Sequence, residues 1–219
     1  MAAKRELTDI KVAAHDSVTA HEFVRETLRG AILRGDLETG TRLVQADIAH
    51  WLKVSTTPVR EALRDLATEG LIVLHNHRGG TVRELDWDEM QEILVIREQL
   101  EELAVTLGVE RITDTELGRA DMLCELMANE SDVGTWVDLN RRFHFVLHDA
   151  MRSPQLIDII KRLEEHAAIF IAQAQRRHPE LRRRANDDHV RLLDAYRQRD
   201  AAAALAIQKD HLLLPISMI

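Results

Sequence analysis

The sequence of 219 residues contains a single cysteine, Cys124, and no long hydrophobic run. One cysteine excludes an internal disulfide framework and fits a reducing compartment. No uncharged segment approaches the roughly 18 residues that a membrane-spanning helix needs. Lys4, Arg5 and Lys11 give the first residues positive charge, but no apolar run of signal-peptide length follows them. We therefore expect a soluble cytoplasmic protein.

The chain also lacks an excess of positive charge, because its formal net charge is −8. The distribution of that charge is uneven. Residues 17–84 contain 9 Lys/Arg and 9 Asp/Glu, whereas residues 85–219 contain 17 and 25. This asymmetry predicts two modules, of which only the first is suited to approach a polyanion such as DNA. We expect a mobile arm over residues 1–16, followed by domains over residues 17–84 and 85–219.

In the first module, apolar residues recur at helical spacing three times before the period changes to that of strands. The expected helices cover residues 18–34, 44–52 and 55–69, and the expected strands cover residues 71–74 and 81–83. A loop with two glycines, residues 77–80, joins the strands. Three helices followed by a β-hairpin predict a winged helix-turn-helix.

The third of these helices begins in the segment VSTTPVREAL, residues 54–63. Ser55 is the expected N-cap, and proline is harmless in the first turn that follows. One face, opposite the apolar stripe, carries Thr56, Thr57, Arg60 and Arg64. Hydroxyls at a helix N-terminus seat phosphates, and an arginine one turn later reaches a base edge. An ordinary capped surface helix is the alternative, but the preceding helix and the following hairpin favour DNA binding.

Residues 22–84 resemble the DNA-binding domain of the GntR family of bacterial transcription regulators. The segments that carry the resemblance are GAILRGDLETGTRL, VSTTPVREALRDLATEGLI and RGGTV. It implies that the N-terminal part of the recognition helix and the wing contact DNA. The residues concerned are Ser55, Thr56, Thr57, Arg60, Arg64, Arg78 and Gly79.

Three positions depart from the family pattern. The family usually has glycine at Lys53, so a retained turn forces this lysine into a left-handed conformation that costs about 1 kcal/mol. Arginine is common at the positions of Thr56 and Ala46, and those arginines often contact DNA. This chain is therefore expected to read a different operator or to bind DNA more weakly.

The second module shows helical patterning throughout and no credible strand. The expected helices cover residues 87–108, 114–128, 132–151, 154–177, 184–198 and 200–213. Capping-box signatures at Asp86–Glu89 and Thr113–Glu116 mark two of the helix starts, and Ser153 followed by proline marks another. The whole chain is thus predicted to be mainly α, with a winged helix-turn-helix followed by an all-α bundle.

Histidine spacing in this bundle predicts a metal site. Asn140 and His144 lie four residues apart and share a helix face. His189 precedes Asp200 by 11 residues and His211 follows it by 11, so a helical hairpin turning at Asp200 brings both histidines level. Three histidines and a side-chain oxygen suit zinc or a similar divalent ion.

Other interpretations of these histidines stay open at this point. Any single helical histidine is more often a surface or core residue than a metal ligand. His148 also lies four residues after His144 and could compete as a ligand, and so could His166 from the next helix.

Residues 90–212 resemble the FCD effector domain of the FadR-like branch of the same family. The matching segments are IREQLEELAVTLG, LNRRFHFVLHDAMRSPQLIDII and DDHVRLLDAYRQRDAAAALAIQKDHL. The resemblance implies Asn140, His144, His189 and His211 as ligands of a divalent ion, zinc first, with nickel or manganese as alternatives. The family commonly has aspartate where Asn140 stands. A neutral amide holds the ion less tightly and leaves its charge uncompensated, which favours an anionic ligand.

Arg97 lies in an otherwise apolar stripe with Ile93, Leu100 and Ala104. A buried arginine must be paired, because an isolated buried charge costs several kcal/mol. Its partner is either a structural glutamate or the carboxylate of a bound effector, and the FCD resemblance places an arginine near the pocket here.

The resulting prediction is a transcription regulator and not an enzyme. It would bind palindromic operator DNA as a homodimer and respond to a small carboxylate at a metal-containing pocket, through a shift between conformations. A regulator for which the ion is itself the signal is one alternative. A metal-dependent hydrolase is another, but no HExxH-type motif or obvious general base accompanies the histidines.

Overall fold

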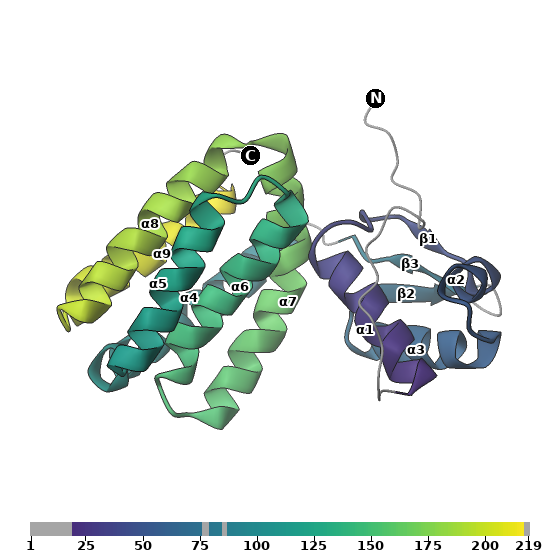
Figure 1. Ribbon diagram of the computed structural model, residues 1–219, viewed down its shortest axis with the longest axis horizontal. Helices are drawn as coiled ribbons and strands as arrows, with labels where there is room; N and C mark the ends of the chain where they lie inside the picture. The colour runs from purple at the N-terminus through teal and green to yellow at the C-terminus, as the bar shows by residue number, and fades with distance from the viewer. Residues whose placement is uncertain (1–18, 76–78, 85–86, 217–219) are drawn as a thin grey trace. The chain divides into compact units, whose positions relative to one another are not determined.

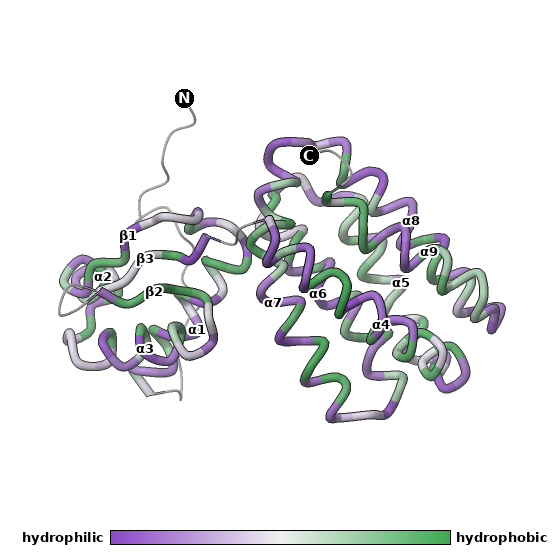
Figure 2. Tube along the Cα trace, turned by 180° about the vertical axis from the view of Figure 1, so that it is seen from behind, coloured by the Kyte–Doolittle hydropathy of each residue, from purple (hydrophilic) through white to green (hydrophobic). Residues whose placement is uncertain are grey.

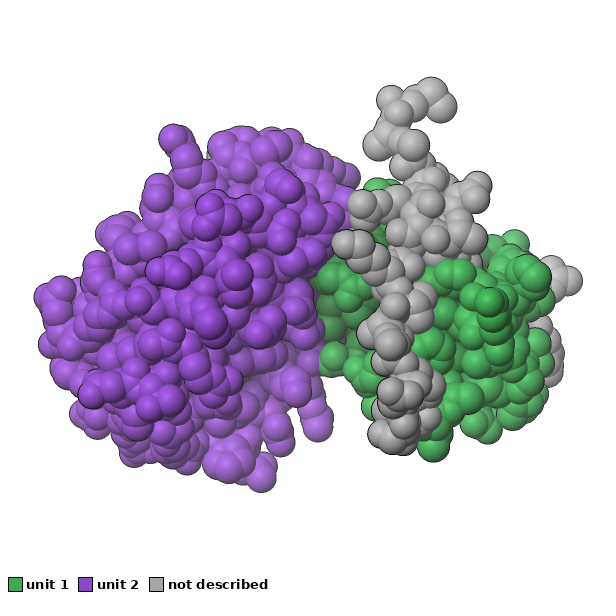
Figure 3. All heavy atoms as spheres, in the orientation of Figure 1, with its two compact units in different colours: residues 1–85 green, residues 86–219 purple. Residues whose placement is uncertain are grey.

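The computed structural model describes residues 19–75, 79–84 and 87–216, apart from the side chain of Pro215. The predicted N-terminal arm and the capping box that starts at Asp86 lie outside these residues. The chain divides into two compact units, Met1–Leu85 and Asp86–Ile219 (Figure 3). No helix among the described residues combines the length and the apolar character that crossing a membrane requires.

The first unit contains three helices and a small antiparallel sheet (Figure 1). Its elements are α1 (Ala20–Leu33), β1 (Arg42–Leu43), α2 (Gln45–Leu52), α3 (Thr56–Thr68), β2 (Ile72–His75) and β3 (Gly79–Val82). A capping box between Thr19 and Glu22 starts α1. The apolar stripes of α1 and α3 pack together, with Leu28 and Leu63 completely buried. This arrangement confirms the predicted winged helix-turn-helix.

The sheet differs from the prediction in two ways. Its strand order is β1-β3-β2, and β1 was not predicted because a two-residue strand shows no period. β3 also begins at Gly79 rather than at Thr81, so the two glycines belong to the strand and not to the loop. Gly79 has a φ of 101°, and a Cβ atom there would overlap the carbonyl oxygen of Leu43 in β1. The close approach of the two strands therefore requires glycine at this position.

Lys53 adopts the left-handed conformation that the turn before α3 requires, with φ 55° and ψ 42°. It is the C-cap of α2, and its side chain is exposed. A lysine can adopt this conformation at a cost of about 1 kcal/mol. The packing of the flanking helices α2 and α3 offsets this cost.

The described residues of the second unit form a bundle of six α-helices followed by a short 3-10 turn. The helices are α4 (Trp87–Arg111), α5 (Asp114–Ala128), α6 (Val133–Asp149), α7 (Pro154–Arg177), α8 (Glu180–Arg197) and α9 (Ala201–Leu213), and the turn is η2 (Leu214–Ile216). Hydrophobic and hydrophilic residues alternate along these helices (Figure 2), as expected when each helix buries one face. The largest fully buried side chains of the bundle are Trp136, Phe143 and Tyr196.

Helix bounds in the bundle follow the predicted capping signals closely. α5 and α7 span the predicted residues, and the capping box of Thr113 and Glu116 is formed. α8 begins earlier than predicted, at Glu180, directly after the proline at position 179. α4 continues to Arg111, because burial of Val109 on the core side outweighs the glycine at position 108.

The turn between α8 and α9 has the predicted form of a helical hairpin. Arg199 is left-handed, with φ 56°, and Asp200 caps α9 by accepting a hydrogen bond from the backbone N–H of Ala203. The guanidinium of Arg199 donates to the carbonyls of Val109 and Ile112 at the end of α4. These bonds satisfy carbonyls that the end of α4 leaves without helical partners.

Candidate metal centre and nucleic-acid interface

α3 presents a polar face that is suited to DNA. Its N-cap is Ser55, which makes no side-chain capping bond. Ser55, Thr56, Thr57, Arg60 and Arg64 are all exposed. Within the part of the chain that the structure describes, neither arginine forms an ion pair. Three free hydroxyls at the start of the helix and two unpaired guanidinium groups in its first nine residues thus lie on this face, which is the arrangement that phosphate and base contacts require.

The wing is described only in part. Arg78, the predicted wing contact, lies outside the described residues. Gly79 is buried in β3, where the approach of Leu43 accounts for the glycine. Its predicted contact with DNA stays a prediction.

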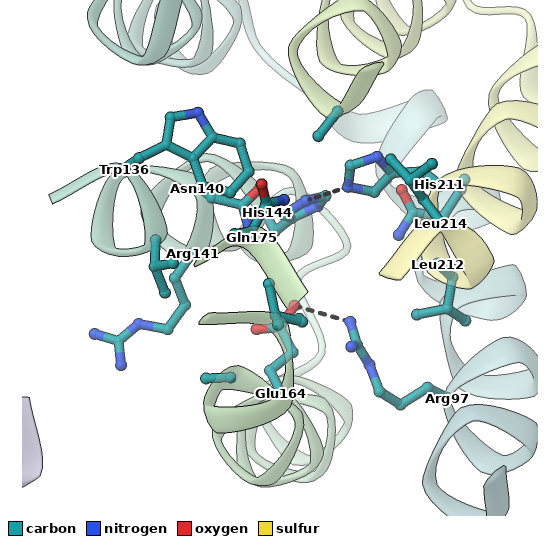
Figure 4. A pocket seen from close by; sticks show the side chains of 15 residues that line it. Arg97, Trp136, Asn140, Arg141, His144, Glu164, Gln175, His211, Leu212 and Leu214 are labelled. Atoms are coloured by element: carbon teal, nitrogen blue, oxygen red, sulfur yellow. Dashed lines mark hydrogen bonds and ion pairs between the residues drawn. The ribbon is translucent and has the colours of Figure 1, made fainter. Parts of the chain in front are cut away.

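Three histidines from three helices meet in the bundle, as the spacing predicted. The ring centroid of His189 on α8 lies 5.2 Å from that of His144 on α6 and 4.7 Å from that of His211 on α9. Nε2 of His144 and Nε2 of His211 are 3.2 Å apart (Figure 4). One nitrogen from each ring lies within 4.8 Å of the others. This spacing allows the three rings to share one ion.

His189 is completely buried, yet neither of its ring nitrogens has a hydrogen-bond partner among the residues that the structure describes. The rings of Phe143 and Trp136 pack beside it. Burial, and then the proximity of His211, lower the pKa of His189 well below its usual value, so the ring is neutral. Burial lowers the pKa of His144 in the same way. Neutral imidazoles offer the lone pairs that a metal ion needs.

Two further side chains complete the surroundings of this cluster. The Oδ1 atom of Asn140, one turn before His144 on α6, is buried and has no hydrogen-bond partner. Oδ2 of Asp188 lies 3.7 Å from Nδ1 of His211. The interaction with His211 lowers the pKa of Asp188 although partial burial opposes it. A carboxylate on the outer nitrogen of a histidine orients the ring toward a metal.

A cavity opens beside the histidines. Its walls come mainly from α6, α7 and α9, and it is lined by both Asn140 and His144. Further residues on its walls include Arg97, Trp136, Arg141, Glu164, Gln175, Gln208, His211 and Leu214 (Figure 4). An ion held by the histidines would therefore face a space that a small molecule can enter.

Arg97 is buried and paired with two glutamates, so structural partners are present, and its predicted contact with an effector stays a prediction. Its Nη2 atom lies 2.8 Å from Oε1 of Glu101 and 3.3 Å from Oε1 of Glu164. Glu101 is the better satisfied of the two, because its Oε2 also accepts hydrogen bonds from Nε2 of His148 at 2.8 Å and Nε2 of Gln208 at 3.1 Å.

Arg97, Glu101, His148 and Glu164 thus form an acidic cluster. His148 belongs to this acidic cluster and not to the three-histidine group, and His166 belongs to neither. Burial opposes protonation of His148, but the carboxylates of Glu101 and Glu164 raise its pKa. Burial also opposes ionisation of Glu101, yet His148 and Arg97 hold its pKa below the usual value. Burial raises the pKa of Glu164.

Sequence reasoning missed Glu101, Glu164 and Gln208. A signal for Glu101 was available, because it follows Arg97 by four residues on one helix. Glu164 and Gln208 come from distant helices, 67 residues after Arg97 and 107 after Glu101 respectively, and only the bundle packing brings them near.

Comparisons with known proteins agree with both units. Residues 20–82 match the family model "Bacterial regulatory proteins, gntR family", and residues 92–214 match the model "FCD domain". The chain is 30% identical over 172 residues to the Nta operon transcriptional regulator of Aminobacter aminovorans, covering 77% of this chain and 80% of that protein. It is 28% identical over 202 residues to the repressor GlaR of Escherichia coli, covering 88% and 92%.

McbR of Escherichia coli is similar in sequence and in structure. The sequences are 31% identical over 152 residues, covering 68% of each chain. A solved structure of McbR superimposes with a TM-score of 0.82 at 26% identity, covering 92% of this chain and 97% of that one. Since these relatives are transcriptional regulators and not enzymes, the hydrolase alternative is set aside. The chain belongs to the GntR family of bacterial transcriptional regulators, in the FadR-like branch that carries an FCD domain.

Proposed function

We propose that this regulator holds a divalent metal ion with His144, His189, His211 and Asn140. The observation that carries the proposal is His189, whose two buried nitrogens have no partner. An unsatisfied buried polar group costs about 1–3 kcal/mol, so such a residue is retained where something else binds it. FCD domains bind metal in some members of the family, which also supports the proposal.

The donor set fits zinc well. Zn–N bonds of about 2.0–2.1 Å place two nitrogens of one tetrahedral ion roughly 3.3 Å apart, close to the 3.2 Å between His144 and His211. Imidazole also suits nickel, and an amide oxygen suits manganese. Asp188 would act from outside the ligand set by orienting His211.

The proposed effector is a small carboxylate that binds at the open side of this ion. Imidazole and amide ligands contribute no negative charge, so the ion would keep its positive charge, which attracts an anion. Arg97 contributes less to that attraction than the sequence predicted, because Glu101 and Glu164 already compensate it. The effector's carboxylate would thus be held by the ion. Arg97 and Glu164 of the acidic cluster would form another part of the cavity wall.

Binding at this cavity would regulate DNA binding by shifting a conformational equilibrium. α4 carries Arg97 and is the first helix of the bundle, beginning at Trp87. We propose that a homodimer presents two α3 helices to a palindromic operator of a metabolic operon in the cytoplasm. The effector would favour one spacing of these helices, and an operator accepts a fixed half-site spacing.

Metal-loaded protein should change its affinity for operator DNA when a small carboxylate is added, and metal-free protein should not. Fluorescence anisotropy on an operator selected from random-sequence DNA measures this, with acetate, lactate and citrate as carboxylates and chelator-treated protein as the control. If removal of the metal changes operator binding and no carboxylate does, the ion is itself the signal.

Arg60→Ala should weaken operator binding by about 1–3 kcal/mol if Arg60 reads a base, with relaxed specificity at one position in each half-site. A phosphate contact would instead lower affinity for all sequences and reduce the salt slope by about 1. Arg25→Ala is the control, because Arg25 pairs with Glu26 on α1 and lies 4.0 Å from Asp65 on α3, so its charge is already compensated. Unchanged operator binding by the Arg60 variant would contradict the assignment of α3 as the recognition helix.

A further inference from the structure

Glu164 differs from Glu101 in the acidic cluster because one of its two carboxylate oxygens accepts no hydrogen bond from the described residues. The residue is 6% exposed, and among the described residues its Oε2 atom has no hydrogen-bond partner. The other oxygen, Oε1, lies 3.3 Å from the guanidinium of Arg97 and 3.8 Å from Nδ1 of His148. Glu101, by contrast, uses both of its oxygens.

Glu164 also lines the same cavity as Asn140, His144 and His211. Figure 4 shows Glu164 and Arg97 meeting on one side of this space and His144 and His211 meeting on the other. The distance between the two sides is short, because the ring of His148 in the acidic cluster lies only 6.2 Å from the ring of His144. A single small molecule can therefore reach both the histidines and Glu164.

We propose that Glu164 selects effectors that carry a hydrogen-bond donor, a hydroxyl or an ammonium group, in addition to the carboxylate at the metal. This inference rests on the proposed function, since it takes the carboxylate end to be held by the ion. Arg97 and His148 lie beside Glu164 as positive partners, and in the ionised carboxylate that they favour the free oxygen is an acceptor, for which a donor on the ligand supplies the missing hydrogen bond. Plain carboxylates leave this oxygen unsatisfied and bind less well.

A second metal ion is the other occupant that the cluster of Glu101, His148 and Glu164 could hold, because their ligand atoms lie within 4.8 Å of one another. Arg97 argues against it. Its guanidinium already bonds both carboxylates and supplies the positive charge there. A neutral or singly charged donor on a ligand fits the remaining oxygen better than a divalent ion does.

The test uses butyrate, its 2-, 3- and 4-hydroxy derivatives, and 4-aminobutyrate, titrated calorimetrically into the zinc-loaded full chain. This series moves the donor along one carbon skeleton, so the natural effector need not be identified first. A hydrogen bond to a charged group should make at least one substituted probe bind about 10- to 100-fold more tightly than butyrate.

Glu164→Leu should reduce that advantage to less than about threefold, while zinc content and butyrate binding persist. Glu165→Leu is the matched control, because Glu165 is similarly buried on α7 but does not line the cavity. If the leucine variant fails to fold, Glu164→Gln replaces it. The amide keeps an acceptor without the charge, so the advantage of 4-aminobutyrate should fall most.

The outcomes separate the two proposals. If butyrate binds and no substituted probe binds more tightly, or if the advantage survives in Glu164→Leu, the role of Glu164 is wrong while the metal-bound carboxylate stands. If no probe binds the zinc-loaded chain, both proposals are wrong. If zinc content falls in Glu164→Leu, Glu164 supports the metal instead of the ligand.

Discussion

Replacing His189 with leucine should abolish tight metal binding and, at the same time, stabilise the metal-free protein. Both ring nitrogens of His189 are buried without partners, and their loss should raise the free energy of unfolding of the metal-free form by about 1–3 kcal/mol. Leucine has a similar volume and suits the surrounding rings of Phe143 and Trp136. A residue kept for packing alone would show the opposite change.

Metal content measured by mass spectrometry and unfolding measured with and without chelator test both halves of this prediction. In the unmodified protein, free ion at 100 times its Kd should add about 2.7 kcal/mol to the free energy of unfolding. The His189→Leu variant should lose this increment.

His148→Leu is the contrasting variant for this experiment. It should keep its full metal complement, yet its metal-free form should be less stable, because Glu101 loses a hydrogen-bond partner. A full metal complement in the His189 variant would rule out the proposed ligand set. Loss of the ion from the His148 variant alone would place the metal site in the acidic cluster.

Arg97→Leu should lower the free energy of unfolding by about 3–5 kcal/mol, because it leaves two buried glutamates without their shared cation. Glu101 and Glu164 are only 1% and 6% exposed, so solvent compensates their charges far less than the guanidinium does. Chemical denaturation measures the loss. Arg141→Leu is the control, because Arg141 also lines the cavity but pairs with the partly exposed Asp138, and such pairs contribute about 0–1 kcal/mol.

The loss in Arg97→Leu should also depend on pH. In the intact protein, Arg97 and His148 hold the pKa of Glu101 below its usual value. Without Arg97, the pKa of Glu164, which burial already raises, should rise further above the unfolded value of about 4.3. The variant should therefore lose more stability at pH 7 than near pH 3, where this carboxyl is protonated in both the folded and the unfolded state. A loss below about 1 kcal/mol at pH 7 would mean that the pair is not the stabilising contact described here.

Local patterns in the sequence determined the helices and the first set of candidate ligands. Capping signals and apolar periodicity are properties of neighbouring residues, so α5 and α7 could be predicted to the residue. The proximity of His189 and His211 could be predicted as well. Each histidine is 11 residues from Asp200, so a turn there places both at the same height along two antiparallel helices. The left-handed backbone of Lys53 was instead predicted from the resemblance to the family, which usually has glycine at this position.

Only the tertiary structure decided which residues meet across helices. β1 exists because β3 pairs with it, and two residues carry no pattern of their own. Arg97 required a buried partner from its position in an apolar stripe, but the presence of two glutamates beside it depended on how α4 packs against α7 and α9. That packing brings Glu164 and Gln208 to the Arg97 cluster and separates His148 from the other histidines. Burial then sets the charge of each group, because the cost of desolvation depends on the whole surrounding fold and not on the neighbours in sequence.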